Sequence, residues 1–487
     1  MTSRQIAGSL GVLVLILLPT TPFARTNKMT TGLSTSYDYD DRQSEPATQN
    51  PATNIVLGKE ANTSENNYSR LVIRPLLDFV SDSQEDHFEL RANPSLKYDL
   101  LGYQTDWDND LFLSAERSIT KAWQLNASNA FLRSDYHDPL SGETVDSGNQ
   151  NIPSSTPGLS SDPGRTRYWR NTLTVGSKYL YDQQSLVGLG ADFIVLRNDE
   201  SKLINNYKDY DRYTFHLNNE HRFNTTWKTL ADLSFVRGNY YDAAPNAATS
   251  EVAPGLTRNN LSSDLNEYHL VATVENNYFR QNKLLLNYNY IGTQYDEGLR
   301  NNDEIHQSRL SWRRDFSQQL NTTLGGGPSY EKTEGQDGNW GENGIAEINY
   351  LIQHGSFTFA VEKRYDVDNF SGTDARGFID YWDTHFLFNY ELFDHITLDG
   401  RIAYRYEDRK DPVAVTGSPL ISSDPTLVEY RKNLVTTGLG LHYAFLRYYS
   451  AGLNYTFTRQ NSDRIGDDYD DHRLLFSLSW KQEWLRW

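Results

Sequence analysis

The sequence predicts an all-β chain that closes on itself as a transmembrane, antiparallel, up-and-down β-barrel of about twenty strands, with eighteen as the alternative count. Two observations support this fold class. Apolar and polar residues alternate along most of the chain, which is the period-two pattern of strands with two different faces. Short and long connections also alternate, as expected for a barrel with tight turns at one edge and long loops at the other.

The composition indicates a folded chain without hydrophobic helices. The 487 residues are 37% hydrophobic, include 32 Tyr, 10 Trp and 21 Phe, and carry a formal charge of −18. Such aromatic content argues against disorder. A mean hydropathy of −0.68 argues only against helical spans, because half the positions of a barrel strand are polar.

The same composition excludes several functions. The acidic balance argues against a nucleic-acid partner. The chain has no cysteine, which excludes disulfides, thiolate metal sites, thiol nucleophiles and cysteine-attached haem. No cofactor and no metal site are predicted.

The N-terminus predicts export. Residues 1–24 have Arg4 in a short basic head, an apolar run over 6–18, and Ala24 as the last residue before cleavage, as in a signal peptide. The run is shorter than the roughly 20 residues of a membrane helix, and Pro22 leaves the cleavage site uncertain. Residues 25–487 are then one barrel domain. This domain begins almost directly with a strand, so we expect no N-terminal plug domain.

About twenty strands follow the signal peptide, each roughly 10–14 residues long, which is the length that a tilted membrane strand needs. Their apolar outward positions fall within 33–39, 71–79, 88–98, 111–115, 123–131, 169–179, 187–195, 213–217, 227–235, 268–274, 284–290, 310–312, 320–324, 346–352, 357–361, 382–390, 396–406, 435–443, 451–457 and 474–480.

Segment 396–406 shows the alternation most clearly. Its even positions include Ile396, Leu398 and Ile402, and its odd positions include Asp399 and Arg401. We expect the first set to face lipid and the second a wet interior. A register slip by one residue would place the charged set in hydrocarbon.

Four long polar stretches separate the hairpins, over residues 41–66, 135–165, 239–264 and 409–427. Their Asn, Asp, Ser, Pro and Gly content is typical of loops. The connections between them are tight. An even number of strands places both chain ends at the short-turn, periplasmic edge, and the long loops are able to fold in and constrict the mouth.

Residues 98–139 combine a short loop, a lipid-facing hairpin with a turn at ITKAW, and a long polar loop. This rhythm resembles the outer-membrane β-barrel porins of Gram-negative bacteria. Within them it is similar to loosely defined β-barrel porin families, some of which accompany exopolysaccharide export. The resemblance implies an outer-membrane location, contact with outer-membrane lipid and lipopolysaccharide, and insertion by the β-barrel assembly machinery. It brings no catalytic motif.

The C-terminus fits this pattern imperfectly. Barrel-assembly substrates end with an aromatic residue on an alternating last strand, and Trp487 is the final residue here. However, Leu474, Trp480 and Trp484 have the opposite parity. Either the last strand ends near Trp480 with a short tail, or a bulge resets the alternation.

The predicted lumen-lining side chains are charged residues of both signs on the inward parity. They are Arg74, Glu89, Arg91, Arg170, Arg212, Glu267, Arg309, Arg313, Glu362, Arg364, Asp383, Asp399, Arg401 and Arg405. At about twenty strands the interior is too wide for side chains to fill.

A channel for passive diffusion or export of polar solutes or polysaccharide is the leading function. For any single charged residue, an ion pair that stiffens the wall is the simpler interpretation.

Two other functions remain open. One is a sheath around a periplasmic or extracellular partner protein, such as a multihaem cytochrome. The other is a membrane-embedded hydrolase built on Asp383 and His385, although no G-x-S-x-G element is present.

Three acidic stretches, 38–42, 106–110 and 466–473, pack carboxylates closely. One interpretation is that divalent cations bridge them to one another or to lipopolysaccharide phosphates. Because none has EF-hand spacing, solvated loops are the preferred interpretation.

Overall fold

A computed structural model describes residues 25–44, 67–134, 168–198, 209–241, 264–279, 281–296, 301–367, 369–370, 377–411, 428–463 and 468–486. The predicted signal peptide and most of the four long polar stretches lie outside these residues. No helix among the described residues is long and apolar enough to cross a membrane.

The described residues form 21 strands. The first eleven are β1 (Thr26–Ser44), β2 (Tyr68–Asp82), β3 (Asp86–Ala92), β4 (Ser95–Asp99), β5 (Thr105–Thr120), β6 (Trp123–Ser134), β7 (Tyr168–Asp182), β8 (Ser185–Asn198), β9 (Asp209–Arg222), β10 (Trp227–Tyr241) and β11 (Leu265–Phe279). The others are β12 (Asn282–Tyr295), β13 (Asp303–Asp315), β14 (Leu320–Thr333), β15 (Asn339–Ile352), β16 (Gly355–Val367), β17 (Phe378–Phe393), β18 (Ile396–Asp411), β19 (Val428–Phe445), β20 (Tyr449–Ser462) and β21 (Tyr469–Arg486).

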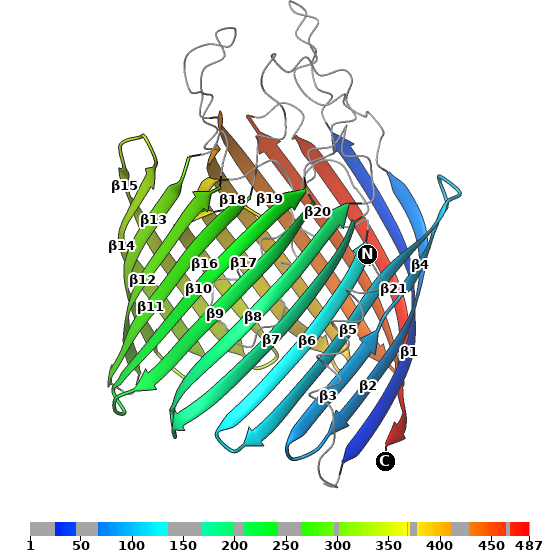
Figure 1. Cartoon of the computed structure of the whole chain (residues 1–487). Helices are drawn as coiled ribbons and strands as arrows, with labels where there is room; N and C mark the ends of the chain where they lie inside the picture. Colours follow the sequence, from blue (N-terminus) through cyan, green and yellow to red (C-terminus); the bar gives the residue numbers. More distant parts are fainter. Residues whose placement is uncertain are drawn as a thin grey trace, which may run out of the picture.

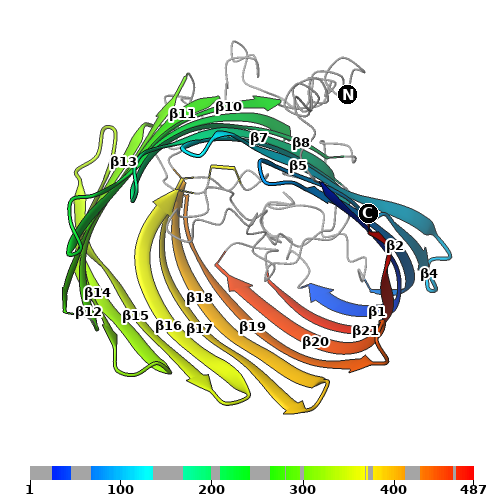
Figure 2. The same cartoon turned by 90° about the horizontal axis from the view of Figure 1, so that it is seen from below.

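These strands close into one antiparallel barrel (Figures 1 and 2). Each strand pairs with its neighbours in sequence, and β21 pairs with β1 to complete the ring. The strands β3 and β4 share one place in the wall, because both lie between β2 and β5. The break between them falls at Pro94, which has no N–H for a ladder bond. The predicted closed barrel of twenty strand positions is therefore confirmed.

The described connections keep the predicted alternation of lengths. The turns at one edge are tight, as between β7 and β8 or between β15 and β16. β1 begins and β21 ends at this same edge, where Thr26 pairs with Asp82 and Lys28 pairs with Arg486. The opposite edge carries the longer connections, which we call the loop edge.

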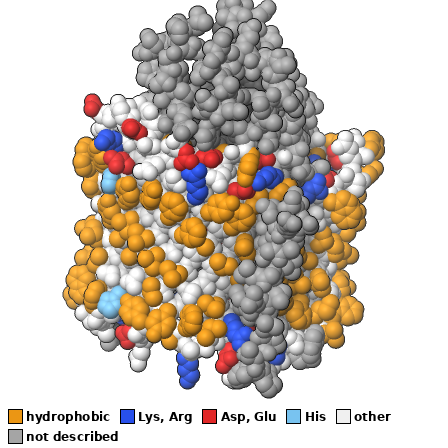
Figure 3. All heavy atoms as spheres, viewed as in Figure 1, with side chains coloured by type: hydrophobic (Ala, Val, Ile, Leu, Met, Phe, Trp, Pro, Cys, Tyr) orange, Lys and Arg blue, Asp and Glu red, His pale blue; other side chains and the backbone are white. Residues whose placement is uncertain are grey.

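The wall has an apolar outer face, and an apolar band lies between two charged rims (Figure 3). On β18 the side chains of Ile402 and Tyr404 are 54% and 41% exposed, whereas those of Glu407 and Arg409 are buried. The outward and inward sets predicted for segment 396–406 therefore lie on opposite faces. Aromatic residues such as Trp382 border the band near the loop edge.

The C-terminal strand contains the bulge. The pairing of β21 with β1 shifts register between Met29 and Thr30, so that Glu483 pairs with Thr30 and Leu485 with Met29. Trp484 is the extra residue, and its ring lies 6.3 Å from that of Trp480. Of the two alternatives for the last strand, the structure shows the bulge, which resets the alternation. Trp487 lies outside the described residues.

The three acidic stretches belong to strands rather than to loops, which corrects the sequence interpretation. Residues 38–42 lie in β1, residues 106–110 in β5, and residues 469–473 in β21. Several of their charges are paired within the wall. For example, Arg473 donates to Asp38 at 2.8 and 3.0 Å across the β1–β21 junction. In the part of the chain that the structure describes, no group of His, Asp and Glu is arranged to hold a metal ion.

Candidate conduit and its inward-folded strand end

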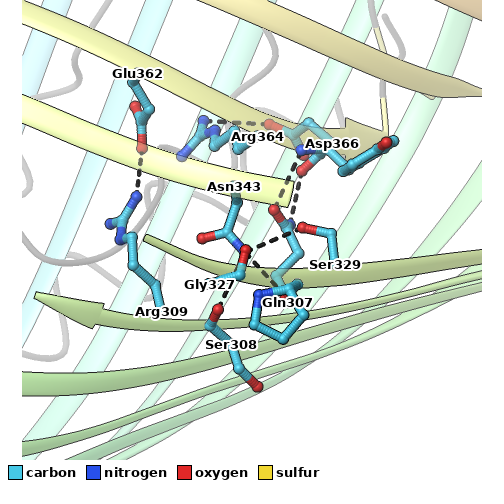
Figure 4. Close-up of polar contacts among 11 residues, drawn as sticks. Gln307, Ser308, Arg309, Gly327, Ser329, Asn343, Glu362, Arg364 and Asp366 are labelled. Atoms are coloured by element: carbon cyan, nitrogen blue, oxygen red, sulfur yellow. Dashed lines mark hydrogen bonds and ion pairs between the residues drawn. The ribbon is translucent and has the colours of Figure 1, made fainter. Parts of the chain in front are cut away.

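A long ion pair spans the inner face of β13 to β16. Arg309 on β13 donates to Glu362 on β16 at 3.0 Å (Figure 4), although β14 and β15 lie between them. Gly325 and Gly327 make this reach possible, because β14 has no side chain there. A Cβ at Gly327 would stand 1.9 Å from the backbone oxygen of Ser308. Glycine is thus required at position 327, where the Arg309 side chain passes over the inner face of β14.

The ladder between β15 and β16 stops short of the loop edge. Its last pair is Gly344 with Lys363, although β15 begins at Asn339 and β16 continues to Val367. The amide of Gln307 on β13 satisfies the freed backbone of Tyr365: it donates to the carbonyl at 2.8 Å and accepts from the N–H at 3.1 Å. The end of β16 therefore lies inside the ring, against the inner face of β13.

Apolar packing holds this inward-folded end. Tyr365 and Phe378, from β16 and β17, form a buried cluster with Ile291 and Ile305 of the inner wall. The Tyr365 hydroxyl lies over Gly341, where a Cβ would meet it at 2.3 Å. The upper ends of β16 and β17 thus form a second layer inside β12 to β15, and Figure 2 shows β16 ending within the ring.

Beside this overlap, one amide ties three strands together. The Asn343 Nδ2 lies within 3.0 to 3.2 Å of the backbone oxygens of Ser308, Gly327 and Pro328, and of the Ser329 hydroxyl (Figure 4). This buried amide stabilises β13, β14 and β15 at the height where β15 loses its partner.

Asn369, two residues beyond the end of β16, is anchored on the inner face of β10 to β12. The Asn369 amide donates to Glu267 at 2.7 Å and to Thr293 at 3.3 Å, and its oxygen accepts from the Tyr295 hydroxyl at 2.9 Å. The Tyr240 hydroxyl donates to the Asn369 backbone oxygen. Asn369 is 1% exposed, so its polar atoms are matched as burial requires.

Phe370 fills a cradle next to this anchor. Its ring packs against Tyr210 and Tyr240, with centroids 5.4 and 5.9 Å away, and the Arg212 guanidinium lies 4.8 Å above it. Gly238 forms the floor, where a Cβ would stand 2.7 Å from the ring. The cradle belongs to the larger buried cluster of β7 to β12. Phe370 therefore fits a space that the inner wall leaves for it.

An ion-pair cluster lies on β18 and β19. Glu407 is buried and accepts from Arg405 and Arg409, each at 2.6 Å. Lys432 pairs with Glu407 across the strands, and Arg405 stacks on Tyr381 at 4.3 Å. The Glu407 carboxylate is thus held by several cations, and Asp383 lies opposite Arg405 on the neighbouring strand, so this part of the inner wall is a mixed-charge network.

Strand pairing puts the fourteen predicted lumen residues on the inner face, and most of them have a polar or aromatic partner there. The contacts are Glu89–Arg91, Arg212–Phe370, Glu267–Asn369, Arg309–Glu362, Arg313–Asp315, Arg364–Asp366, Asp383–His385, Asp399–His442 and Arg405–Glu407. By register, Arg74 faces Ser34, Arg170 faces Leu132 and Leu196, and Arg401 faces Leu387 and Gly438. Contact with a passing solute stays a prediction.

At the loop edge, a rim ion pair fixes the end of β12. Arg237 donates to both oxygens of Asp296, at 2.7 and 2.5 Å. The guanidinium lowers the pKa of the Asp296 carboxyl below its ordinary value. This carboxylate therefore stays charged over a wider pH range than an isolated one.

Sequence reasoning missed the residues that shape the mouth, chiefly Gln307, Asn343, Asn369 and Phe370. The connection that carries Asn369 and Phe370 has the composition of an ordinary polar turn. The run Gly325–Gly327 was the one visible signal, because consecutive glycines within a strand indicate close approach.

Comparisons with known proteins agree on the fold and go no further. No family model matches the chain, and no curated protein matches it. Among solved structures, the ferric enterobactin receptor PfeA of Pseudomonas aeruginosa is similar with a TM-score of 0.50 and 10% identity, covering 93% of this chain and 81% of that one. Two further similar structures have a TM-score of 0.40: OpdQ of Pseudomonas aeruginosa (11% identity, 94% and 98% covered) and OccAB4 of Acinetobacter baumannii (12% identity, 93% and 98% covered).

Proposed function

We propose that the chain is a porin-like channel of a bacterial outer membrane, which carries polar solutes or polysaccharide by passive diffusion or export. The observation that carries this proposal is the contrast between its two faces. An apolar outer band suits lipid, because a closed barrel satisfies every backbone polar group there. The inner face is lined by charged and polar residues, which suit water.

The inward-folded end of β16 and the Asn369 anchor support a narrowed mouth rather than a wide open tube. Asn369 and Phe370, which follow β16, contact the inner face of β9 to β12. Solutes would pass beside these two residues and beside the ion-pair cluster around Glu407. Such a geometry favours small polar solutes, and opposed charges tune selectivity.

Reconstitution into planar bilayers tests the proposal. The purified full chain should give stepwise current increases, and ion selectivity follows from the reversal potential in a salt gradient. A silent bilayer, with inserted and folded protein, would contradict the channel. Co-purification of a haem protein would instead support the sheath.

No enzymatic activity is proposed. His385 and Asp383 do lie 3.0 Å apart, and such a pair orients an imidazole. It supplies no nucleophile by itself. An esterase assay of the wild-type chain and Asp383→Asn should show no activity that depends on this carboxylate.

A further inference from the structure

A groove opens on the outer face of the barrel at the loop edge of β11 to β14. Its volume is about 270 Å³, and its lining includes Tyr268, Tyr290, Gln294, Glu304 and Lys332. These side chains share the outward parity, because Tyr268 pairs with Gly292, and Gly292 pairs with Glu304. Most of the lining thus lies on the outer face, and the buried residues Thr293 and Asp303 border it from the other parity.

The floor of the groove is a glycine. A Cβ at Gly292 would stand 2.4 Å from the Tyr290 hydroxyl, so a side chain there would displace the tyrosine. Tyr268, 41% exposed, borders the floor from β11. The Tyr290 ring therefore lies over Gly292, and the two tyrosines form one side of the groove.

Aromatic rings continue from the groove along the outer face of β12 to β15. Ring centroids are 4.9 Å apart for Tyr290 and His306, 6.2 Å for His306 and Tyr330, and 5.0 Å for Tyr330 and Trp340. Trp340 is 76% exposed. This row offers aromatic surface beside the groove against which a ligand can pack.

The polar groups of the groove select the kind of ligand. The Lys332 Nζ lies 3.9 Å from the Glu304 Oε1, which is too far for a hydrogen bond. The ammonium can therefore donate to a ligand, and the carboxylate can accept from one. Glu334 adds a second carboxylate. Two carboxylates and one ammonium disfavour a bare phosphate. Donors, acceptors and aromatic rings around a small volume suit a ligand with many hydroxyl groups.

We propose that this groove binds a saccharide, and that its source is the headgroup of a glycolipid in the outer leaflet. Apolar side chains lie directly below on the same strands, including Leu286, Leu310 and Leu324, which are 51%, 57% and 49% exposed. If this band is embedded in lipid, the groove stands at the level of the lipid headgroups. The inference rests on the membrane location in the proposed function, and not on conduction.

Native mass spectrometry of the full chain in detergent tests binding. The probe is the oligosaccharide released from lipopolysaccharide by mild acid, and lipid nanodiscs with intact lipopolysaccharide or with phosphatidylglycerol alone form the second arm. Wild type should retain the oligosaccharide. Tyr290→Ala and Gly292→Phe should weaken binding about tenfold, as expected for loss of one good contact. Tyr350→Ala, on the outer face at the short-turn edge and 43% exposed, is the matched control.

The outcomes separate the two sources. Retention of the free oligosaccharide supports the saccharide site. Retention of intact lipopolysaccharide alone, lost in Gly292→Phe, supports it with the glycolipid as the required source. Equal retention by Gly292→Phe and wild type, or preference for phosphatidylglycerol, would overturn it. Circular dichroism and heat-dependent gel migration confirm that each variant is folded. A barrel that failed to conduct would give the same binding results.

Discussion

Phe370 is the side chain whose removal should open the mouth of the barrel most directly. It is 2% exposed, and its ring sits on Gly238 between two tyrosines. Phe370→Ala keeps the backbone and the neighbouring Asn369 anchor but empties the cradle. We expect Asn369 and Phe370 to leave the inner face of β9 to β12 for part of the time.

The size of the effect follows from the burial. Replacing a fully buried Phe by Ala costs about 3–5 kcal/mol. This cost would lower the ratio of docked to undocked segment by roughly 10²–10⁴. The hydrogen bonds of Asn369, one of them to a carboxylate and so worth about 1.5–3 kcal/mol, oppose release. Phe370→Ala should therefore produce open-state current fluctuations, and the double variant with Asn369→Ala should produce a larger steady conductance.

Single-channel recording in planar bilayers measures both quantities. Gly238→Val is an independent perturbation, because a side chain at this position collides with the Phe370 ring from below. Gly438→Val is the matched control: it also faces the interior, but a Cβ there meets nothing closer than 3.9 Å. If Phe370→Ala and Gly238→Val both conduct with the same amplitude and noise as wild type, the anchor does not control the mouth.

Three further predictions concern the wall. Gln307→Ala removes both hydrogen bonds to the Tyr365 backbone and should destabilise the barrel by about 1–3 kcal/mol. Urea unfolding in vesicles measures this loss, and an unchanged midpoint would contradict the role given to Gln307. Ile402→Arg places a charge on the outer face and should cost about 2–4 kcal/mol if it lies near mid-bilayer, whereas Ala403→Arg, facing inward, should cost far less; equal losses would reverse the assignment of faces. Asp296→Asn should lower the melting temperature at neutral pH. Because the wild-type carboxyl has a lowered pKa, its stabilisation is present above the ordinary aspartate range and disappears as the pH falls through the lowered value, so the two proteins should then melt alike.

The alternation of residues predicted the strands and their faces because each strand touches two different environments. Ile402 and Arg401 lie on opposite faces for this reason, and a register slip would be penalised along the whole strand. The alternating connection lengths predicted the two edges in the same way. Local patterns report local environments, and in a barrel these recur at every hairpin.

The C-terminal bulge and the inward-folded end of β16 depend instead on contacts between residues that are far apart in the sequence. Two arrangements near Trp484 fitted the sequence equally well, and only pairing with β1 selected the bulge. Asn369 lies 102 residues from its partner Glu267. No local pattern encodes such a contact, because the two residues meet only once the ring has closed.

The sequence by itself determined a closed barrel, its oily and polar faces, its two edges and the inward parity of its charged residues, since these depend on whether each side chain meets an apolar or a polar environment. The tertiary structure decided where the wall overlaps itself, which side chains anchor the residues after β16 and where the outer face forms a groove. These features depend on bare glycines meeting distant side chains, and such complementarity exists only after the strands have taken their places.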